Sequence, residues 1–213
     1  MRHVPRYLFF ILFVKPMVLL VLGLNVRHRE RLTVEGPAIL VANHNSHLDA
    51  WVMMNLFPLR MLHRLRPVAA SDYFMKGKFS SWLATRVVGI VPFHRLRHGA
   101  HDDPLAGCGE AIDRGDVLLF FPEGTRGEPE ERLAFKTGIA HLAKRYEDIP
   151  VLPVFLYGCG KALPRKTAIL VPFVCDVFVG EPVRWAGDRG SFMEALEHRM
   201  AELAGEHHLG TWE

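Results

Sequence analysis

The chain has 213 residues, of which 49% are hydrophobic and 23% are charged, and its formal net charge at pH 7 is +3. This length suits one folded domain with a substantial core, to which we add an N-terminal appendage. The sequence has no zinc-finger spacing, basic heptad helix or aromatic RNA-binding signature, so nucleic acid is not an expected partner. Its three cysteines, odd in number and without pattern, predict no disulfide framework or metal site and fit a reducing compartment.

The first predicted element is an apolar segment from residue 7 to 25, close to a bilayer span in length. A signal peptide is disfavoured because no small-residue cleavage site follows. Lys15 and Pro16 in the middle fit a single uniform span poorly, so a helix lying in the membrane interface, or a shallow hairpin, is an equal alternative. A buried core helix is less favoured, since no polar face is visible. Basic residues on both flanks give no clean orientation.

Further along the chain, strand-like and helix-like patterns alternate. Two short strands flank Gly36-Pro37, and the second, over residues 38–42, reads as a buried strand. The remaining elements are a helix over 49–57, a strand over 67–70, a helix over 79–88, a strand over 90–93, a helix over 104–114, a strand over 117–121, a helix over 134–146, strands over 151–157 and 175–179, and a helix over 191–204. This alternation predicts one layered α/β domain with a mixed, largely parallel central sheet flanked by helices.

Polar motifs follow three of these strands. NHNSHLD comes after the strand over 38–42, FHRLR after the strand over 90–93, and FPEGTR at the end of the strand over 117–121. In α/β domains ligands bind beyond the carboxyl ends of the strands. We therefore expect the three motifs to form one site.

Within NHNSHLD, His44 can accept a proton near neutral pH, and Asp49 can orient its ring from the first turn of the following helix. The same residues have a structural interpretation, because Ser46 and Asp49 have the spacing of a capping box. A metal site built on His44 and His47 is disfavoured, because no further ligands complete it. The spacing alone leaves the catalytic and capping interpretations open.

In FPEGTR, Gly124 allows a tight turn and Arg126 offers a planar fork suited to a phosphate group. Glu123 can bind a hydroxyl or orient Arg126. A strand-ending turn with solvated side chains is the alternative.

The motifs together resemble the glycerolipid acyltransferase superfamily, which contains lysophosphatidic acid and glycerol-3-phosphate acyltransferases. NHNSHLD matches its NHxSxxD block, GIVPFHR (89–95) resembles its second block, FPEGTR its third and IPVLPV (149–154) its fourth. Phe135 to Gly138 resembles the FKxG that follows the third block. The resemblance covers about residues 33–182, with Pro92 as a departure from the usual second block.

The resemblance implies that His44 is a general base oriented by Asp49. It implies that the acceptor's phosphate and glycerol are held by the substrate-binding residues of the second and third blocks, namely Arg95, Glu123, Gly124, Thr125 and Arg126. The region around Pro153 would line an apolar surface near the acyl donor. No covalent acyl-enzyme is expected, which agrees with the absence of a GxSxG motif.

The implied reaction moves an acyl chain from acyl-CoA or acyl carrier protein to a lysophospholipid, with 1-acyl-glycerol 3-phosphate favoured over glycerol 3-phosphate or another lysolipid. Neither a cofactor nor a metal is expected. The alternatives from other classes are a metal-dependent hydrolase and a non-catalytic lipid-binding module. We expect residues 1–30 to anchor the protein to membrane lipids at the cytoplasmic face and residues 31–213 to form the acyltransferase domain.

Overall fold

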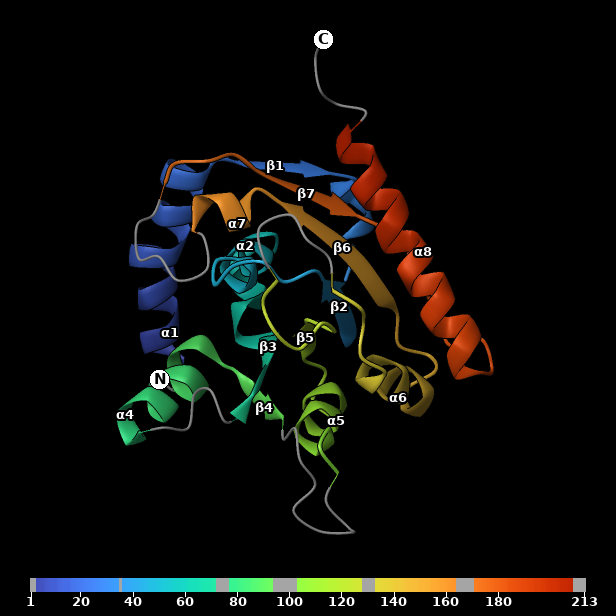
Figure 1. Cartoon of the computed structure of the whole chain (residues 1–213). Helices are drawn as coiled ribbons and strands as arrows, with labels where there is room; N and C mark the ends of the chain where they lie inside the picture. The colour runs from blue at the N-terminus through green and yellow to red at the C-terminus, as the bar shows by residue number, and fades with distance from the viewer. Residues whose placement is uncertain are drawn as a thin grey trace.

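The fold is built on one mixed β-sheet, seen in a computed structural model that describes residues 3–34, 36–71, 77–93, 103–127, 133–163 and 171–208. Within these ranges seven strands pair in the order β1-β7-β6-β2-β5-β3-β4 (Figure 1). Their bounds are β1 (Leu24–Arg27), β2 (Ala38–Ala42), β3 (Leu65–Ala70), β4 (Val91–Phe93), β5 (Val117–Phe120), β6 (Val151–Tyr157) and β7 (Cys175–Val179).

Most strand pairs in this sheet are parallel. β2 lies between β5 and β6 and is parallel to both, and β3 is parallel to β5 and β4. β7 runs antiparallel to β6, and β1 is parallel to β7. The predicted mixed, largely parallel sheet is therefore confirmed. Because β2 and β5 are parallel neighbours, the loops that follow them leave the same edge of the sheet side by side.

Helices cover both faces of the sheet. Alternate residues of β2 point to opposite faces, as the pleat requires, so that Leu40 joins one core cluster and Ile39 and Val41 join the other. The N-terminal helix, α2 (Asp49–Asn55) and α7 (Cys159–Ala162) lie on the first face. The second face carries α5 (Ala106–Asp113), α6 (Gly138–Arg145) and α8 (Arg189–His208), and Figure 1 shows α1 and α8 at opposite sides of the molecule.

The N-terminal segment forms a continuous helix from Val4 to Leu22, comprising α1 (Val4–Phe9) and two π-helical stretches, η1 (Phe10–Val14) and η2 (Met17–Leu22). The wider π-helical turn is visible at Lys15, whose backbone N–H donates to Phe10 O just before Pro16. Every fourth side chain is buried against the domain, and these are Arg6, Phe10, Val14, Val18 and Leu22. The helix is long and apolar enough to cross a membrane, yet one face is part of the core.

One predicted strand is wrong, and another strand was missed. Where a strand was predicted, Arg31 ends a short 3₁₀ helix, η3 (Arg29–Arg31), and residues 32–34 contain no strand. The strand beside the N-terminal helix is instead β1, which begins directly after Gly23. Gly23 has a φ of +59°, a conformation that ends the helix and turns the chain toward β7. β1 thus belongs to the sheet, although it lies within the predicted membrane anchor of residues 1–30. The boundary between this anchor and the domain of residues 31–213 stays a prediction.

The other predicted elements are confirmed, with shifts at their ends. α4 (Lys78–Trp82) and η5 (Leu83–Val88) form the helix expected before β4, and η4 (Leu59–Arg64) is an additional 3₁₀ segment before β3. α6 begins at Gly138 rather than at residue 134. The reason is local: Lys136 N–H donates to Pro122 O at 2.9 Å, so this stretch pairs with the loop after β5 instead of starting a helix.

Candidate active site

Two hydrogen bonds to the His44 backbone join the loop after β2 to the loop after β5. The Oε1 atom of Glu123 accepts a hydrogen bond from His44 N–H at 3.3 Å, and Gly127 N–H donates to His44 O at 2.9 Å. Both loops leave the same sheet edge, because β2 and β5 are parallel neighbours. The structure thus brings NHNSHLD and FPEGTR together, as their placement at strand ends predicts.

Within the first loop, His44 and Asp49 are in direct contact. Nδ1 of His44 lies 2.8 Å from Oδ2 of Asp49. The Asp49 side chain is 1% exposed and that of His44 is 22% exposed, so the carboxylate is sealed while the ring reaches the surface of the site. With Nδ1 bonded to a carboxylate, the tautomer that carries its proton on Nδ1 is favoured, and Nε2 is left as the basic nitrogen.

The same Asp49 oxygen also organises the loop backbone. Oδ2 accepts hydrogen bonds from Asn45 N–H and Ser46 N–H, both at 2.8 Å. The bond to Ser46 N–H is the return arm of the predicted capping box. The forward arm differs, since Ser46 Oγ accepts from Leu48 N–H at 3.3 Å and donates to Leu163 O at 3.1 Å. The capping contact and the contact with His44 therefore coexist on one oxygen.

Asn43 is a site residue that the sequence did not reveal. Its side-chain amide donates to Leu156 O and accepts from Leu156 N–H, both at 2.8 Å, and also donates to Asn45 Oδ1 at 2.9 Å. Just beyond the end of β2, the Asn43 side chain thus makes the pair of hydrogen bonds to Leu156 that a strand backbone would otherwise make. This pairing fixes the start of the loop to β6 and so fixes the position of His44.

A second missed residue is Phe121, at the end of β5. Its ring stacks on the ring of His44, with centroids 4.3 Å apart and planes inclined by 26°. Phe121 is half-buried and follows β5 directly, but in the sequence it ends the apolar run over 117–121 that predicts this strand. Together with Asp49 it restrains the imidazole from two directions.

The predicted substrate-binding residues of FPEGTR point in different directions. Glu123 is 1% exposed, and its Oε1 faces the His44 backbone. Gly124 has a φ of +68°, and a Cβ there would lie 2.9 Å from Lys136 Nζ, which brings a basic side chain over the turn. Thr125 is exposed. Their substrate-binding roles stay predictions.

Arg126 contacts the first motif through His47. Its Nη1 donates to Nε2 of His47, a role for this histidine that its spacing did not suggest. Partial burial, followed by the positive charges of Arg126 and His44, lowers the pKa of His47 below its usual value. A neutral ring is the form that can accept a hydrogen bond from Arg126. Arg95, the remaining predicted phosphate ligand, lies outside the described residues.

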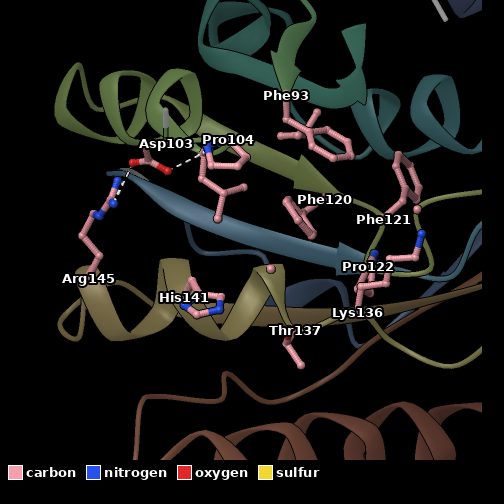
Figure 2. A pocket seen from close by; sticks show the side chains of 14 residues that line it. Phe93, Asp103, Pro104, Phe120, Phe121, Pro122, Lys136, Thr137, His141 and Arg145 are labelled. Carbon is pink, nitrogen blue, oxygen red and sulfur yellow. Dashed lines mark hydrogen bonds and ion pairs between the residues drawn. The ribbon is translucent and has the colours of Figure 1, made fainter. Parts of the chain in front are cut away.

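An apolar cavity of about 460 Å³ adjoins these loops. Figure 2 shows Phe93, Phe120 and Phe121 along one side and α6 along the other, with Lys136 toward one end. The opposite end carries the ion pair between Arg145 and Asp103, at 2.7 Å. The cavity therefore runs from Phe121, which also stacks on His44, to the exposed Asp103–Arg145 pair near β4 and the start of α5. Pro153, in β6, is not among its described lining residues.

No three His, Cys, Asp or Glu side chains in the described ranges are grouped so that they could hold a metal ion. The predicted absence of a metal and a cofactor stays a prediction.

Comparison with known proteins identifies the family. Residues 23–157, from the turn before β1 to the end of β6, match the family model named Acyltransferase. The chain belongs to this acyltransferase family. The match spans NHNSHLD, FPEGTR and the strands that position both.

Several relatives within the acyltransferase family carry related names. The chain is 28% identical over 177 residues to the 1-acyl-sn-glycerol-3-phosphate acyltransferases alpha of Bos taurus and of Homo sapiens, covering 83% of this chain and 59% and 60% of theirs. It is 30% identical over 130 residues to the chloroplastic 1-acyl-sn-glycerol-3-phosphate acyltransferase BAT2 of Brassica napus, covering 61% of this chain and 36% of the relative. The chain thus spans less than two thirds of the length of these curated relatives.

The fold is also shared with a solved structure. The 1-acyl-sn-glycerophosphate acyltransferase of Thermotoga maritima superposes with a TM-score of 0.74 at 21% identity, covering 96% of this chain and 80% of the other. This similarity confirms the predicted fold class.

Proposed function

We propose that this acyltransferase moves a fatty acyl chain from a thioester donor to the hydroxyl of a lysophospholipid, with 1-acyl-glycerol 3-phosphate as the favoured acceptor. The observation that carries the proposal is the 2.8 Å contact between Nδ1 of His44 and the buried Oδ2 of Asp49. The names of the relatives support the acceptor class. The donor is acyl-CoA or acyl carrier protein.

The proposed chemistry follows from this geometry. Nε2 of His44 removes the proton of the acceptor hydroxyl as the oxygen attacks the thioester carbonyl, and Asp49 stabilises the imidazolium that forms. The tetrahedral intermediate collapses, the carbon–sulfur bond breaks, and the thiolate takes the proton from the imidazolium. The products are the ester and a free thiol, and no acyl-enzyme is needed. General-base catalysis of this kind contributes roughly 10² to 10⁴-fold.

For the acceptor, we assign Arg126 to the phosphate group, with Arg95 as a second ligand on the strength of the family resemblance. The guanidinium fork suits a phosphate, and its bond to His47 keeps it beside the dyad. The Lys136 ammonium next to Gly124 adds positive charge to the same loop.

For the donor, we assign the acyl chain to the apolar cavity. Phe121 is both a wall of that cavity and the stacking partner of His44, so a chain lying there would place its carbonyl near the base. About 460 Å³ is enough for a ligand of this kind to bury most of its surface.

For the membrane, we propose that the N-terminal helix lies in the interface rather than spanning the bilayer. Its outer face is apolar and exposed, with Leu20 83% exposed, Phe13 63% and Leu12 61%. A complete span would strip Phe10, Val14 and Val18 from the core. A helix with one face on the domain and one face in lipid avoids that loss. The expected location at the cytoplasmic face remains part of this proposal.

The decisive experiment measures thiol release by the purified chain with acyl-CoA or acyl carrier protein and three acceptors: lysophosphatidic acid, glycerol 3-phosphate and a zwitterionic lysolipid. We expect turnover with lysophosphatidic acid, its loss in His44→Ala, and unchanged vesicle binding by that variant. Activity only on an acceptor without phosphate would overturn the role of Arg126. Unaltered turnover by His44→Ala would remove His44 as the base.

Two further measurements test the alternative functions, a metal-dependent hydrolase and a lipid-binding module. A metal-dependent hydrolase would lose activity with a chelator and regain it with zinc, whereas we expect the chelator to have no effect. A non-catalytic lipid-binding module would bind vesicles and release no thiol with any acceptor.

A further inference from the structure

The second carboxylate oxygen of Asp49 has a different environment from the first. Oδ2 accepts hydrogen bonds from His44 Nδ1 and two backbone amides. Oδ1 is equally buried, and it has no hydrogen-bond partner among the residues that the structure describes. A buried carboxylate oxygen is costly without a donor. The neighbour that can supply one is a thiol.

That thiol belongs to Cys159, at the start of α7 and directly after β6. Gly158 has a φ of +88°, and a Cβ on it would lie only 2.4 Å from Val174 O, so the chain turns tightly here. The turn places the Cys159 thiol, 2% exposed, near enough to Asp49 for the carboxylate to act on its ionisation. Behind it lies Cys175 at the start of β7, fully buried, with the two Sγ atoms 3.4 Å apart.

The Cys159 thiol is held in its protonated form. Its contact with Cys175, its burial and the negative charge of Asp49 together raise the pKa of Cys159 well above the usual value for a thiol. It therefore stays an S–H donor at any pH at which His44 can act as a base. In the structure Cys159 Sγ donates toward Cys175 Sγ, and Cys175 Sγ lies 4.0 Å from Phe173 O as its own acceptor. A thiol proton rotates about the C–S bond, so Cys159 can turn its proton from Cys175 to Asp49.

We infer that Cys159 is a positioning residue of the dyad, its S–H donating to Oδ1 of Asp49 with Cys175 supporting it from behind. The inference rests on the proposed function. A thiol is a weak donor, so it holds the carboxylate in place while withdrawing little of its charge. That charge is what stabilises the imidazolium of His44. The chemistry predicts opposite effects for a stronger donor and for no donor at all.

The test compares Cys159→Ala and Cys159→Ser with the unaltered chain in reducing buffer. The stronger hydroxyl donor of Cys159→Ser withdraws more charge from Asp49 and should lower the pKa of His44 by about half a pH unit. Removing the weak thiol donor in Cys159→Ala leaves Asp49 more basic and should raise the pKa of His44 by a smaller amount. The first measurement is an NMR pH titration of labelled histidine, with the His44 signal assigned by its loss in His44→Gln. The second is the acid limb of the kcat/KM profile, which should move with the titration.

Two matched variants complete the design. Cys108→Ala removes a fully buried thiol from α5, in the other core cluster, and should leave both readouts unchanged. Cys175→Ala removes the support behind Cys159 and should shift the pKa of His44 by less than Cys159→Ala does. In Cys159→Ala we expect kcat to fall about 3- to 10-fold with KM unchanged, because the dyad loses orientation rather than substrate contacts.

Failure of this inference can be told apart from failure of the proposed function. Identical His44 titrations in Cys159→Ala, Cys159→Ser and the unaltered chain would overturn the role of Cys159, and this readout needs no substrate. Full turnover by His44→Ala would instead overturn the function. A shift of the same sign in the alanine and serine variants would also refute the inference, since it would point to altered packing.

Discussion

The ring of Phe121 stacks on the ring of His44 with 4.3 Å between their centroids, so the first residue of FPEGTR packs against the proposed base. This contact joins the second carboxyl-end loop to the first at the level of side chains. It also makes Phe121 part of two features at once, the restraint on His44 and the wall of the apolar cavity.

Replacing Phe121 with Leu should lower kcat/KM about 10- to 100-fold, because small displacements of a catalytic group have effects of this size. Phe93→Leu is the matched control, since Phe93 lines the same cavity. It should alter KM for long-chain donors and leave kcat nearly unchanged. Steady-state kinetics with donors of two chain lengths separate the effects, and equal losses in both variants would contradict a special role for the stacking contact.

Asp49→Asn should reduce kcat by about 10² to 10⁴-fold, because a neutral amide lacks the negative charge that stabilises the imidazolium of His44. The amide oxygen can still accept hydrogen bonds from Asn45 N–H and Ser46 N–H, so the loop should keep its shape. Thiol release measures the expected loss of kcat, and thermal unfolding checks that the loop keeps its shape. A variant with normal kcat would mean that Asp49 serves the backbone alone.

His47→Gln tests the pH dependence of the Arg126 contact. The pKa of His47 in the folded chain lies below its usual 6.5, so as pH falls the unfolded chain takes up this proton first. His47 therefore leaves stability unaffected above pH 6.5 and lowers it as pH falls from about 6.5 through the folded pKa. Gln can accept a hydrogen bond from Arg126 without titrating. The Tm of the variant should therefore fall less between pH 7.5 and 5.5 than the Tm of the unaltered chain.

The same pair should govern acceptor affinity. A protonated His47 cannot accept from Arg126 and repels it, so KM for lysophosphatidic acid should rise below pH 6.5 in the unaltered chain and less in His47→Gln. His198→Gln, at an exposed histidine of α8, is the control. Parallel pH profiles for all three proteins would exclude His47 as the titrating group.

The two faces of the N-terminal helix predict different results on substitution. Leu12→Gln together with Leu20→Gln should weaken binding to anionic vesicles while Tm stays unchanged, because both side chains are exposed. Val18→Gln should lower the free energy of unfolding by about 2 kcal/mol or more, since a polar amide replaces a fully buried side chain. Vesicle co-sedimentation and thermal unfolding measure the two effects. Unchanged co-sedimentation of the double variant would show that another surface binds the membrane.

Local sequence patterns predicted most of the strands and the loops of the candidate site. Continuous apolar runs mark β2, β5 and β6 because strands buried on both faces need no polar residues. The polar motifs at strand ends, in the family's order, predicted the loops of the candidate site. The hydrogen bond from His44 N–H to the Glu123 carboxylate confirms that two of those loops meet. The strand β1 was missed because only Gly23, at a positive φ, separates it from an apolar helix.

Only the tertiary structure decided which partner each site residue has. The strand order places β2 between β5 and β6, so Asn43 pairs with Leu156 more than a hundred positions away, and Ser46 donates to Leu163 O. Such contacts depend on which strands are neighbours, and local propensity carries no information about that choice. The sequence by itself determined the chemistry available at each loop, while the packing of the sheet determined which of those groups face one another.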